Sequence, residues 1–289
     1  MKKHKKSKLK QLLITFIFIS IGIFRLQIYN LLTVELGKGP QNIITHCVPL
    51  YSNELLMKKL IIASTSTLYK GNYLGYLQQE LEILFRDTQE VLFIPYARPG
   101  GISHENYTKI AAKAFDSIGK DLRGIHTFKN PTQAIENAQG IFTGGGNTFL
   151  LVQQLHDNKL LAPIRKAIID GAPYLGTSAG SNICGITMQN TNDMPIVYPP
   201  SFNTLGVIPF NINAHYIDPD PKTTHMGESR ATRIKEYHTQ NTTAVVGLPE
   251  GSWLEVIGDT ISLKGNHSAR IFEKGKEPYL LETGAILSL

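Results

Sequence analysis

Residues 176–180 read GTSAG, and this stretch decides how the rest of the chain is interpreted. The apolar residues 172–175 lead into it as a short buried strand, and small residues lead out of it as a helix. A Gly-x-Ser-x-Gly sequence at a sharp strand-to-helix turn holds the serine clear of the backbone, and its small neighbours let a substrate carbonyl approach. The pattern therefore predicts a nucleophile at Ser178, with the amide of Ala179 pointing at a developing oxyanion.

The segments around this turn alternate between short apolar runs and helical patterns. The runs expected as strands are 60–64, 90–96, 124–128, 140–143, 172–175 and 244–248. The segments expected as helices are 73–85, 106–118, 132–138, 148–156, 159–170 and 229–239. This alternation predicts an α/β fold with a parallel sheet, helices on both faces and a site at the carboxyl ends of the strands. Short strands separated by glycine near the C-terminus indicate antiparallel pairing.

Two of the expected helices carry further local information. Within 106–118, the apolar residues Ile110, Ala114 and Ile118 recur at intervals of four, so we expect them to share one buried face. In the helix over 132–138, Pro131 stands at the first position, where proline is favoured.

The first 56 residues differ in character from the rest. Six lysines among the first ten residues match the whole net charge of +6, so the basic excess is a tail and does not indicate a nucleic-acid partner. The apolar run 12–24, with a weaker continuation to residue 32, fits a signal peptide, a membrane anchor or a chain whose translation begins at Met57. We favour the third. Residues 1–56 are then an extension, residues 57–289 are the catalytic domain, and the location is cytoplasmic. Membrane attachment through 12–32 is the alternative.

Cysteine usage gives no evidence of a cross-linked or metal-bound fold. The chain of 289 residues has two cysteines, Cys47 and Cys184, and the first lies outside the main domain, so a structural disulfide is not expected. No spacing of cysteine and histidine suggests zinc, and we expect no metal. The sequence does not indicate an oligomeric state.

The triple glycine 144–146 ends another expected strand and precedes Asn147. It lacks the Lys-Ser/Thr of a phosphate-binding P-loop and the spacing of a dinucleotide fingerprint. Two interpretations stay open: the glycine amides form the second half of an oxyanion hole, or they only make a tight turn.

A nucleophilic serine needs a base, and histidine is the usual one. Beyond Ser178 the candidates are His215, His225, His238 and His267. We expect His238 on a solvated helix surface and His267 in a polar turn. His215 follows the apolar run 207–212, at a point where a sheet would present it.

The base in turn needs an acid to orient it. Asp193 and Glu250 both qualify, the second because it follows the expected strand 244–248. Each also has a structural interpretation, because Asn-Asp before Met-Pro favours a turn and Glu250 stands beside a loop glycine. The spacing does not choose between them.

Six motifs in a fixed order extend this picture from about Met57 to the C-terminus. They are GGGNT at 144–148, GTSAG at 176–180, TNDMPI at 191–196, NAHY at 213–216, HMGESR at 225–230 and GLPEG at 247–251. Together they resemble peptidase E, the aspartyl dipeptidase family of serine peptidases. The resemblance implies a flavodoxin-like fold of the class I glutamine amidotransferase type, with serine in place of cysteine. It also implies small peptide substrates that begin with aspartate, and no metal or other cofactor.

The resemblance also implies roles for individual residues. These are Ser178 as nucleophile, His215 as base, Asp193 or Glu250 as acid, Gly146 and Ala179 as oxyanion-hole donors, and Arg230 and Asn147 as substrate-binding residues. Arginine suits a carboxylate because its planar fork can donate two hydrogen bonds. Thr177 and Met226 depart from the residues common in the family, an aromatic and a lysine, which bears on fine specificity.

Three rival functions remain open at this point. Cyanophycinase shares the serine elbow and cuts aspartyl linkages of a polymer. An esterase of the α/β-hydrolase type has the same Ser, Asp, His order, but only 37 positions separate Ser178 from His215. A membrane-tethered binding domain would rest on the apolar run 12–24 alone.

Overall fold

The computed structural model describes residues 57–289 except 221, 223 and 225. The expectations for the basic tail, for the apolar segment 12–32 and for Cys47 lie outside these described residues. Among the described residues, no helix has both the length and the apolar character needed to cross a bilayer.

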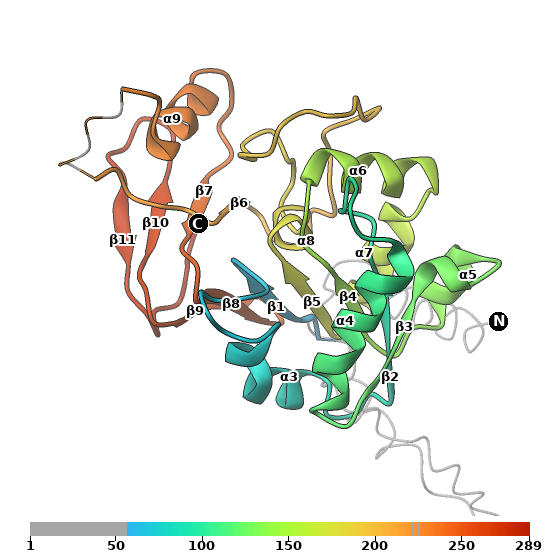
Figure 1. The fold of residues 1–289 in the computed structure, drawn as a ribbon. Coiled ribbons are helices and arrows are strands. Elements are labelled where there is room, and N and C mark those ends of the chain that lie inside the picture. Colours follow the sequence, from blue (N-terminus) through green and yellow to red (C-terminus); the bar gives the residue numbers. More distant parts are fainter. Residues whose placement is uncertain (1–56, 221, 223, 225) are drawn as a thin grey trace, which may run out of the picture. The chain divides into compact units, whose positions relative to one another are not determined.

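A seven-stranded sheet forms the centre of the described fold, in the order β3-β2-β4-β5-β1-β8-β9 (Figure 1). Its strands are β1 (Lys59–Ala63), β2 (Glu90–Ile94), β3 (Asp121–Gly124), β4 (Ile141–Thr143), β5 (Tyr174–Thr177), β8 (Ser252–Ile257) and β9 (Thr260–Gly265). Strands β1 to β5 pair in parallel, whereas β8 pairs antiparallel with β1 and β9 antiparallel with β8. This confirms the predicted α/β class with a mostly parallel sheet.

The central strands are short and almost wholly buried. Every residue of β4 and β5 is buried, as are the last four residues of β1 and of β2. Strands covered on both faces are uninterrupted apolar runs rather than alternating patterns. This is why these segments could be recognised in the sequence.

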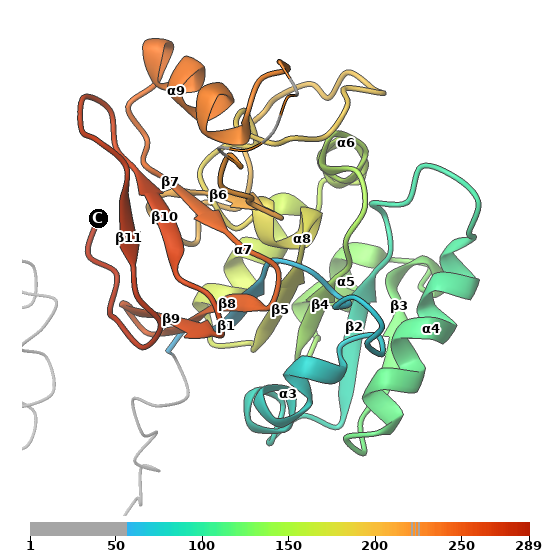
Figure 2. The ribbon, with the colours of Figure 1, turned by 60° about the vertical axis from the view of Figure 1, so that its left-hand side comes forward.

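Helices cover both faces of this sheet (Figure 2). They are α3 (Gln78–Leu84), α4 (His104–Asp116), α5 (Pro131–Glu136), α6 (Thr148–Asp157), α7 (Leu161–Ile169) and α8 (Ala179–Asn182), with short 3-10 turns η2 (Gly75–Leu77) and η3 (Ile125–Thr127). Residues of α3 and α4 pack in one hydrophobic cluster, and residues of α5, α6, α7 and α8 pack in another. Side-chain caps fix several starts, since Ser103, Asn130 and Asn147 each accept a backbone N–H from the first turn.

The buried face of α4 differs from the one expected. Tyr107, Ala111 and Phe115 are fully buried, whereas Ile110 is 42% exposed. Both aromatic rings pack against sheet residues, Tyr107 on Phe93 and Phe115 on Phe142. Aromatic rings bury more area than aliphatic side chains. The aromatic row therefore faces the sheet, and the prediction for Ile110 was wrong.

The strand expected over 124–128 is also displaced. Strand β3 spans Asp121–Gly124, and the chain then turns through η3. The apolar residue that suggested a strand, Ile125, is buried in this turn instead. A single buried residue shows no periodicity, so the sequence could not distinguish a strand from a turn at this position.

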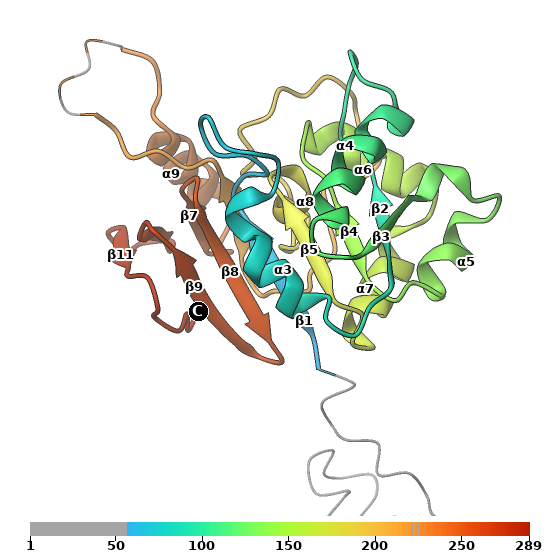
Figure 3. The same cartoon turned by 60° about the horizontal axis from the view of Figure 1, so that its bottom comes forward.

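A second sheet packs beside the first, in the order β11-β10-β7-β6. Its strands are β6 (Asn211–Ala214), β7 (Val245–Leu248), β10 (Ala269–Phe272) and β11 (Tyr279–Leu281), and helix α9 (Arg230–Gln240) joins β6 to β7. Strands β6 and β7 are parallel, and the pairs β7–β10 and β10–β11 are antiparallel. Figure 3 shows these strands beside the long β8 and β9 pair.

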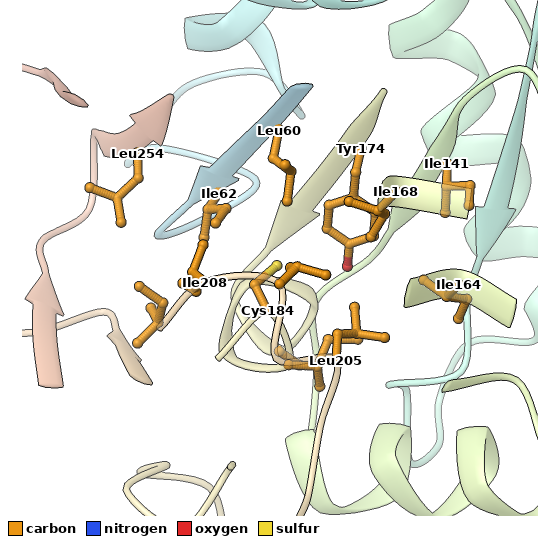
Figure 4. Packing of buried hydrophobic residues seen from close by; sticks show 14 of the residues in the cluster. Leu60, Ile62, Ile141, Ile164, Ile168, Tyr174, Cys184, Leu205, Ile208 and Leu254 are labelled. Carbon is orange, nitrogen blue, oxygen red and sulfur yellow. The ribbon is translucent and has the colours of Figure 1, made fainter. Parts of the chain in front are cut away.

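One hydrophobic cluster joins the two sheets. Leu60, Ile62 and Leu254 of the central sheet share it with Ile212 and Val246 of the second sheet. Figure 4 shows part of this cluster beneath β1 and β5, including Cys184. Burial raises the pKa of the Cys184 thiol well above its ordinary range, so this cysteine is a core residue.

Candidate active site

The turn at Ser178 connects β5 to α8 in a conformation that few residues adopt. Ser178 has φ 53° and ψ −111°, a strained combination for a residue with a side chain. Its N–H donates to the carbonyl oxygen of Ala63 at 3.1 Å. A Cβ at Gly180 would lie 2.1 Å from the Thr143 oxygen, and one at Gly176 would lie 2.5 Å from the Gly180 oxygen. The glycines are therefore required by close backbone approach, as the serine-elbow interpretation predicts.

The triple-glycine turn lies directly against Ser178. A Cβ at Gly145 would meet the Cβ of Ser178 at 2.9 Å, and one at Gly146 would meet the Ala97 oxygen at 2.2 Å. Gly146 also has a φ of +147°. The backbone of this turn thus borders the serine hydroxyl, which favours the oxyanion-hole interpretation without removing the tight-turn one.

His215 follows β6 and faces the serine from the second sheet. Helix α8 packs against both β5 and β6, which brings the two turns together (Figure 1). The Nε2 atom of His215 lies 2.8 Å from the Ser178 hydroxyl, and its Nδ1 atom lies 2.7 Å from Oε1 of Glu250. The histidine side chain is 34% exposed and that of Glu250 is 51% exposed.

The carboxylate of Asp193 lies at the start of α6. It accepts the backbone N–H of Thr148, the first residue of α6, at 2.7 Å. It also accepts the Thr191 hydroxyl at 3.2 Å. A carboxylate at a helix N-terminus is stabilised by the free N–H groups of the first turn. Of the two acids left open by the sequence, Glu250 is the one that contacts His215.

The chain of contacts from Glu250 through His215 to Ser178 is the arrangement needed for nucleophilic catalysis. An imidazole within hydrogen-bond reach can accept the hydroxyl proton as the serine attacks, and a carboxylate on its other nitrogen fixes its orientation. Among the described residues, no group of three or more histidine, cysteine, aspartate or glutamate side chains could hold a metal ion.

Comparison with known proteins identifies the family. The family model for peptidase family S51 matches residues 60–264. The chain belongs to peptidase family S51. It is 41% identical to the peptidase E of Streptomyces coelicolor over 79% of this chain and 93% of that protein. It is also 41% identical to a Drosophila melanogaster protein named "Probable alpha-aspartyl dipeptidase", over 75% and 90% of the two chains.

The solved structures agree on the fold. The crystal structure of a peptidase from an acI-B1 actinobacterium superposes with a TM-score of 0.62 at 18% identity, over 82% of this chain and 98% of that one. At this identity the match concerns the fold alone. The family and its curated relatives make this S51 protein a serine-type peptidase.

Two further predicted residues of this S51 peptidase lie near the turn at Ser178. Asn147 caps α6, since its Oδ1 accepts the Leu150 N–H at 3.0 Å while its Nδ2 donates to the Met194 oxygen at 2.8 Å. These contacts fix the orientation of the amide and use one of its two N–H donors. Arg230 begins α9 and donates to the oxygen of Ala214, the residue before His215, at 3.1 Å.

The half-buried guanidinium of Arg230 has charges of both signs near it, Glu250 and Asp193 on one side of the balance and Arg233 on the other. Burial lowers its pKa, and the neighbouring charges of Glu250 and Asp193 act in the opposite direction. An arginine keeps its charge at any physiological pH. A cation therefore lies next to the residue that precedes His215, and its role toward a substrate stays a prediction.

Other features of the S51 site could not be recognised in the sequence. The buried hydroxyl of Tyr107 donates to the Gly145 oxygen at 3.2 Å and so restrains the position of the triple-glycine turn. Ser64, after β1, contacts the backbone of His215 at 2.9 Å. For Ser64, the sequence feature that pointed to the site was its position at the end of an expected strand.

His238 differs from its expected place on a solvated helix surface. It is buried, and its Nε2 lies 3.0 Å from the Thr243 oxygen.

Proposed function

We propose that this protein is a dipeptidase that removes an N-terminal aspartate from Asp-Xaa substrates by a Ser-His-Glu mechanism. The observation that carries the proposal is the contact chain Ser178–His215–Glu250, with distances of 2.8 Å and 2.7 Å. The family and the names of its curated relatives support the class of substrate.

In this mechanism the Ser178 hydroxyl attacks the carbonyl carbon of the aspartyl residue. His215 Nε2 takes the hydroxyl proton, and Glu250 stabilises the resulting imidazolium through the Nδ1–H. The amides of Ala179 and Gly146 donate to the oxyanion. His215 then gives the proton to the leaving amine, and the second amino acid departs. A water molecule, deprotonated by the same histidine, hydrolyses the aspartyl ester and releases aspartate and the free serine.

Arg230 supplies the specificity for aspartate in this proposal. Its guanidinium binds the side-chain carboxylate of the first substrate residue, because the planar fork can donate two hydrogen bonds to one carboxylate. Its contact with the oxygen of Ala214 supports this role, since it holds the cation next to His215, the proposed base. Asn147 binds the substrate in this proposal through the second N–H of its amide, which is left over after the contacts with Leu150 and Met194.

Replacing the nucleophile tests the reaction. Ser178→Ala should abolish hydrolysis of Asp-Leu, because it removes the hydroxyl that contacts Nε2 of His215, and it should leave the circular dichroism spectrum and the Tm close to wild type. Turnover of Asp-Leu by this variant at an unchanged rate would refute the assignment. Cyanophycin, assayed beside Asp-Leu, separates the polymer-cutting alternative from the dipeptidase.

A panel of dipeptides tests the specificity. Wild type should prefer Asp-Leu to Asn-Leu and Glu-Leu, and Arg230→Met should lower kcat/KM for Asp-Leu by roughly 10- to 150-fold, the range for a hydrogen bond to a charged group. The same variant should change kcat/KM for Asn-Leu much less. Arg230→Lys is the matched control, because it keeps the charge and loses the fork. An equal loss on Asp-Leu and Asn-Leu would contradict this role.

The cytoplasmic location stays a prediction. The alternative, attachment through 12–32, concerns residues outside those described. Cell fractionation, together with the mass of the natural N-terminus, distinguishes the two.

A further inference from the structure

The hydroxyl of Ser64 occupies a central position between the two sheets. Ser64 directly follows β1 and is fully buried. Its Oγ donates to the Leu248 oxygen at 2.7 Å and accepts the N–H of His215 at 2.9 Å. A serine hydroxyl has one donor and two acceptor positions, so both contacts can form at once.

These two contacts reach the segments that carry the base and the acid. Leu248 ends β7, two residues before Glu250, and its oxygen also accepts the N–H of Tyr216 at 3.1 Å. The hydroxyl of Ser64 therefore links the backbone of His215 to the end of the strand that leads to Glu250. The relative position of these two backbone segments determines whether Nδ1 and Oε1 can stay 2.7 Å apart.

The residue before Ser64 holds the nucleophile in the same way. The oxygen of Ala63 accepts the N–H of Ser178 at 3.1 Å and the hydroxyl of Ser181 at 2.6 Å. The end of β1 thus makes contacts to the segments of all three groups in the Ser-His-Glu chain. Ser64 is the residue of this segment whose own side chain makes such contacts, and Ser64→Ala removes them while the backbone contacts of Ala63 remain.

The backbone conformation at His215 makes such support necessary. His215 has a φ of 55°, in the left-handed region that costs energy for a residue with a side chain. Strained conformations persist only where the surrounding contacts over-determine them. The Ser64 Oγ accepts the N–H of His215 itself. Losing this hydrogen bond would free the strained backbone of His215 to relax.

We infer that Ser64 is a positioning residue. Its hydroxyl holds the backbone of His215 and the end of β7, which leads to Glu250, in the geometry needed for proton transfer. This inference rests on the proposed function, because it concerns the same reaction. Ser64 touches no reacting atom, so its loss should slow the chemical step and leave dipeptide binding intact. A misplacement of about 1 Å can cost about 100-fold in rate.

The test compares two buried serines. Ser64→Ala should lower kcat for Asp-Leu by about 10- to 100-fold while KM changes by less than about 3-fold. Sulfonylation of Ser178 by phenylmethylsulfonyl fluoride, in which the serine oxygen displaces fluoride from sulfur, should slow by a similar factor, because that reagent needs the same base and does not use the aspartate-binding residues.

Ser252→Ala is the matched control. Ser252 is also fully buried, and its hydroxyl donates to a backbone carbonyl, that of His267, at 2.8 Å. It should lower the Tm about as much as Ser64→Ala does, with kcat close to wild type. Equal kcat values for the two variants would overturn the inference, because the loss would then reflect general stability.

A shape-matched variant covers the case in which Ser64→Ala does not fold. Ser64→Cys keeps the volume and offers only a weak donor and acceptor, so it should show the same fall in kcat. Wild-type kcat in Ser64→Cys would overturn the inference. Failure of the proposed function has a different signature: Ser178→Ala would then keep activity. An inactive Ser178→Ala beside a fully active Ser64→Ala refutes the positioning role alone.

Discussion

The hydrogen bond between Nδ1 of His215 and Glu250 separates two carboxylates with similar chemistry. Asp193 and Glu250 both lie in loops after Ser178 in the chain, yet the first accepts the N–H of Thr148 and the second contacts the imidazole. The difference arises because β7 lies next to β6, so that the end of β7 meets the residue after β6. At the scale of single residues, strand pairing decides which carboxylate contacts His215.

Glu250→Gln should therefore be far more damaging than Asp193→Asn. A neutral amide cannot stabilise the imidazolium and can favour the wrong tautomer, so kcat should fall by roughly 10³- to 10⁴-fold. Asp193→Asn should lower kcat by less than about 10-fold and destabilise the fold by about 1 kcal/mol, through a weaker contact at the start of α6. Steady-state kinetics with Asp-Leu and urea denaturation measure both effects. A larger fall in kcat for Asp193→Asn would assign the orienting role to Asp193.

Helix α4 shows what the element scale adds. The sequence places the helix correctly to within a few residues, because its Ser103 cap and its apolar spacing are local properties. Which side of the helix faces the sheet is not a local property, because it depends on contacts with residues elsewhere in the sequence. The side that faces the sheet is the one on which Tyr107 and Phe115 meet the rings of Phe93 and Phe142.

Truncating one residue from each side of α4 tests this rotation. Phe115→Ala should destabilise the protein by about 3–5 kcal/mol, because it opens a cavity under the helix. Ile110→Ala, the control on the side first expected to be buried, should cost about 1 kcal/mol or less. Urea denaturation followed by circular dichroism gives both values. Similar losses from the two variants would contradict the observed orientation.

The pairing of two sheets is the feature that matters at the scale of the whole described fold. Ser178 stands on the central sheet and His215 on the second one, and residues of both sheets share one hydrophobic cluster. The separation between nucleophile and base therefore depends on how firmly the sheets are joined. We expect the two sheets to unfold together.

The single tryptophan of the chain offers a probe of this coupling. Trp253 lies in β8 of the central sheet, whereas Ile271 lies in β10 of the second sheet and is fully buried in the shared cluster. Ile271→Ala should destabilise the protein by about 2–5 kcal/mol and shift the urea midpoint of Trp253 fluorescence accordingly, with an unchanged m-value. Ile257→Ala, at an exposed position of β8, should have little effect. An unshifted fluorescence midpoint in Ile271→Ala would mean that the second sheet unfolds by itself.

Much of the site was predictable because its chemistry is local. The glycines around Ser178 are required because a Cβ at Gly176, Gly180 or Gly146 would lie 2.1–2.5 Å from a backbone oxygen, and such restraints leave a fixed pattern in the sequence. His215 could be chosen among four histidines because it ends an apolar run. The misplaced strand at 124–128 and the burial of His238 show the opposite case, in which a single residue without a pattern gave no basis for a correct assignment.

The sequence by itself determined the strand and helix order, the serine turn and the residue types that surround it, because these depend on steric and periodic properties of neighbouring residues. Only the tertiary structure decided that Glu250 contacts His215, that Ser64 lies between them, and which side of α4 is buried. These contacts join residues separated by tens to hundreds of positions, and they exist only once the strands have paired, α4 has packed on the central sheet and the two sheets have met.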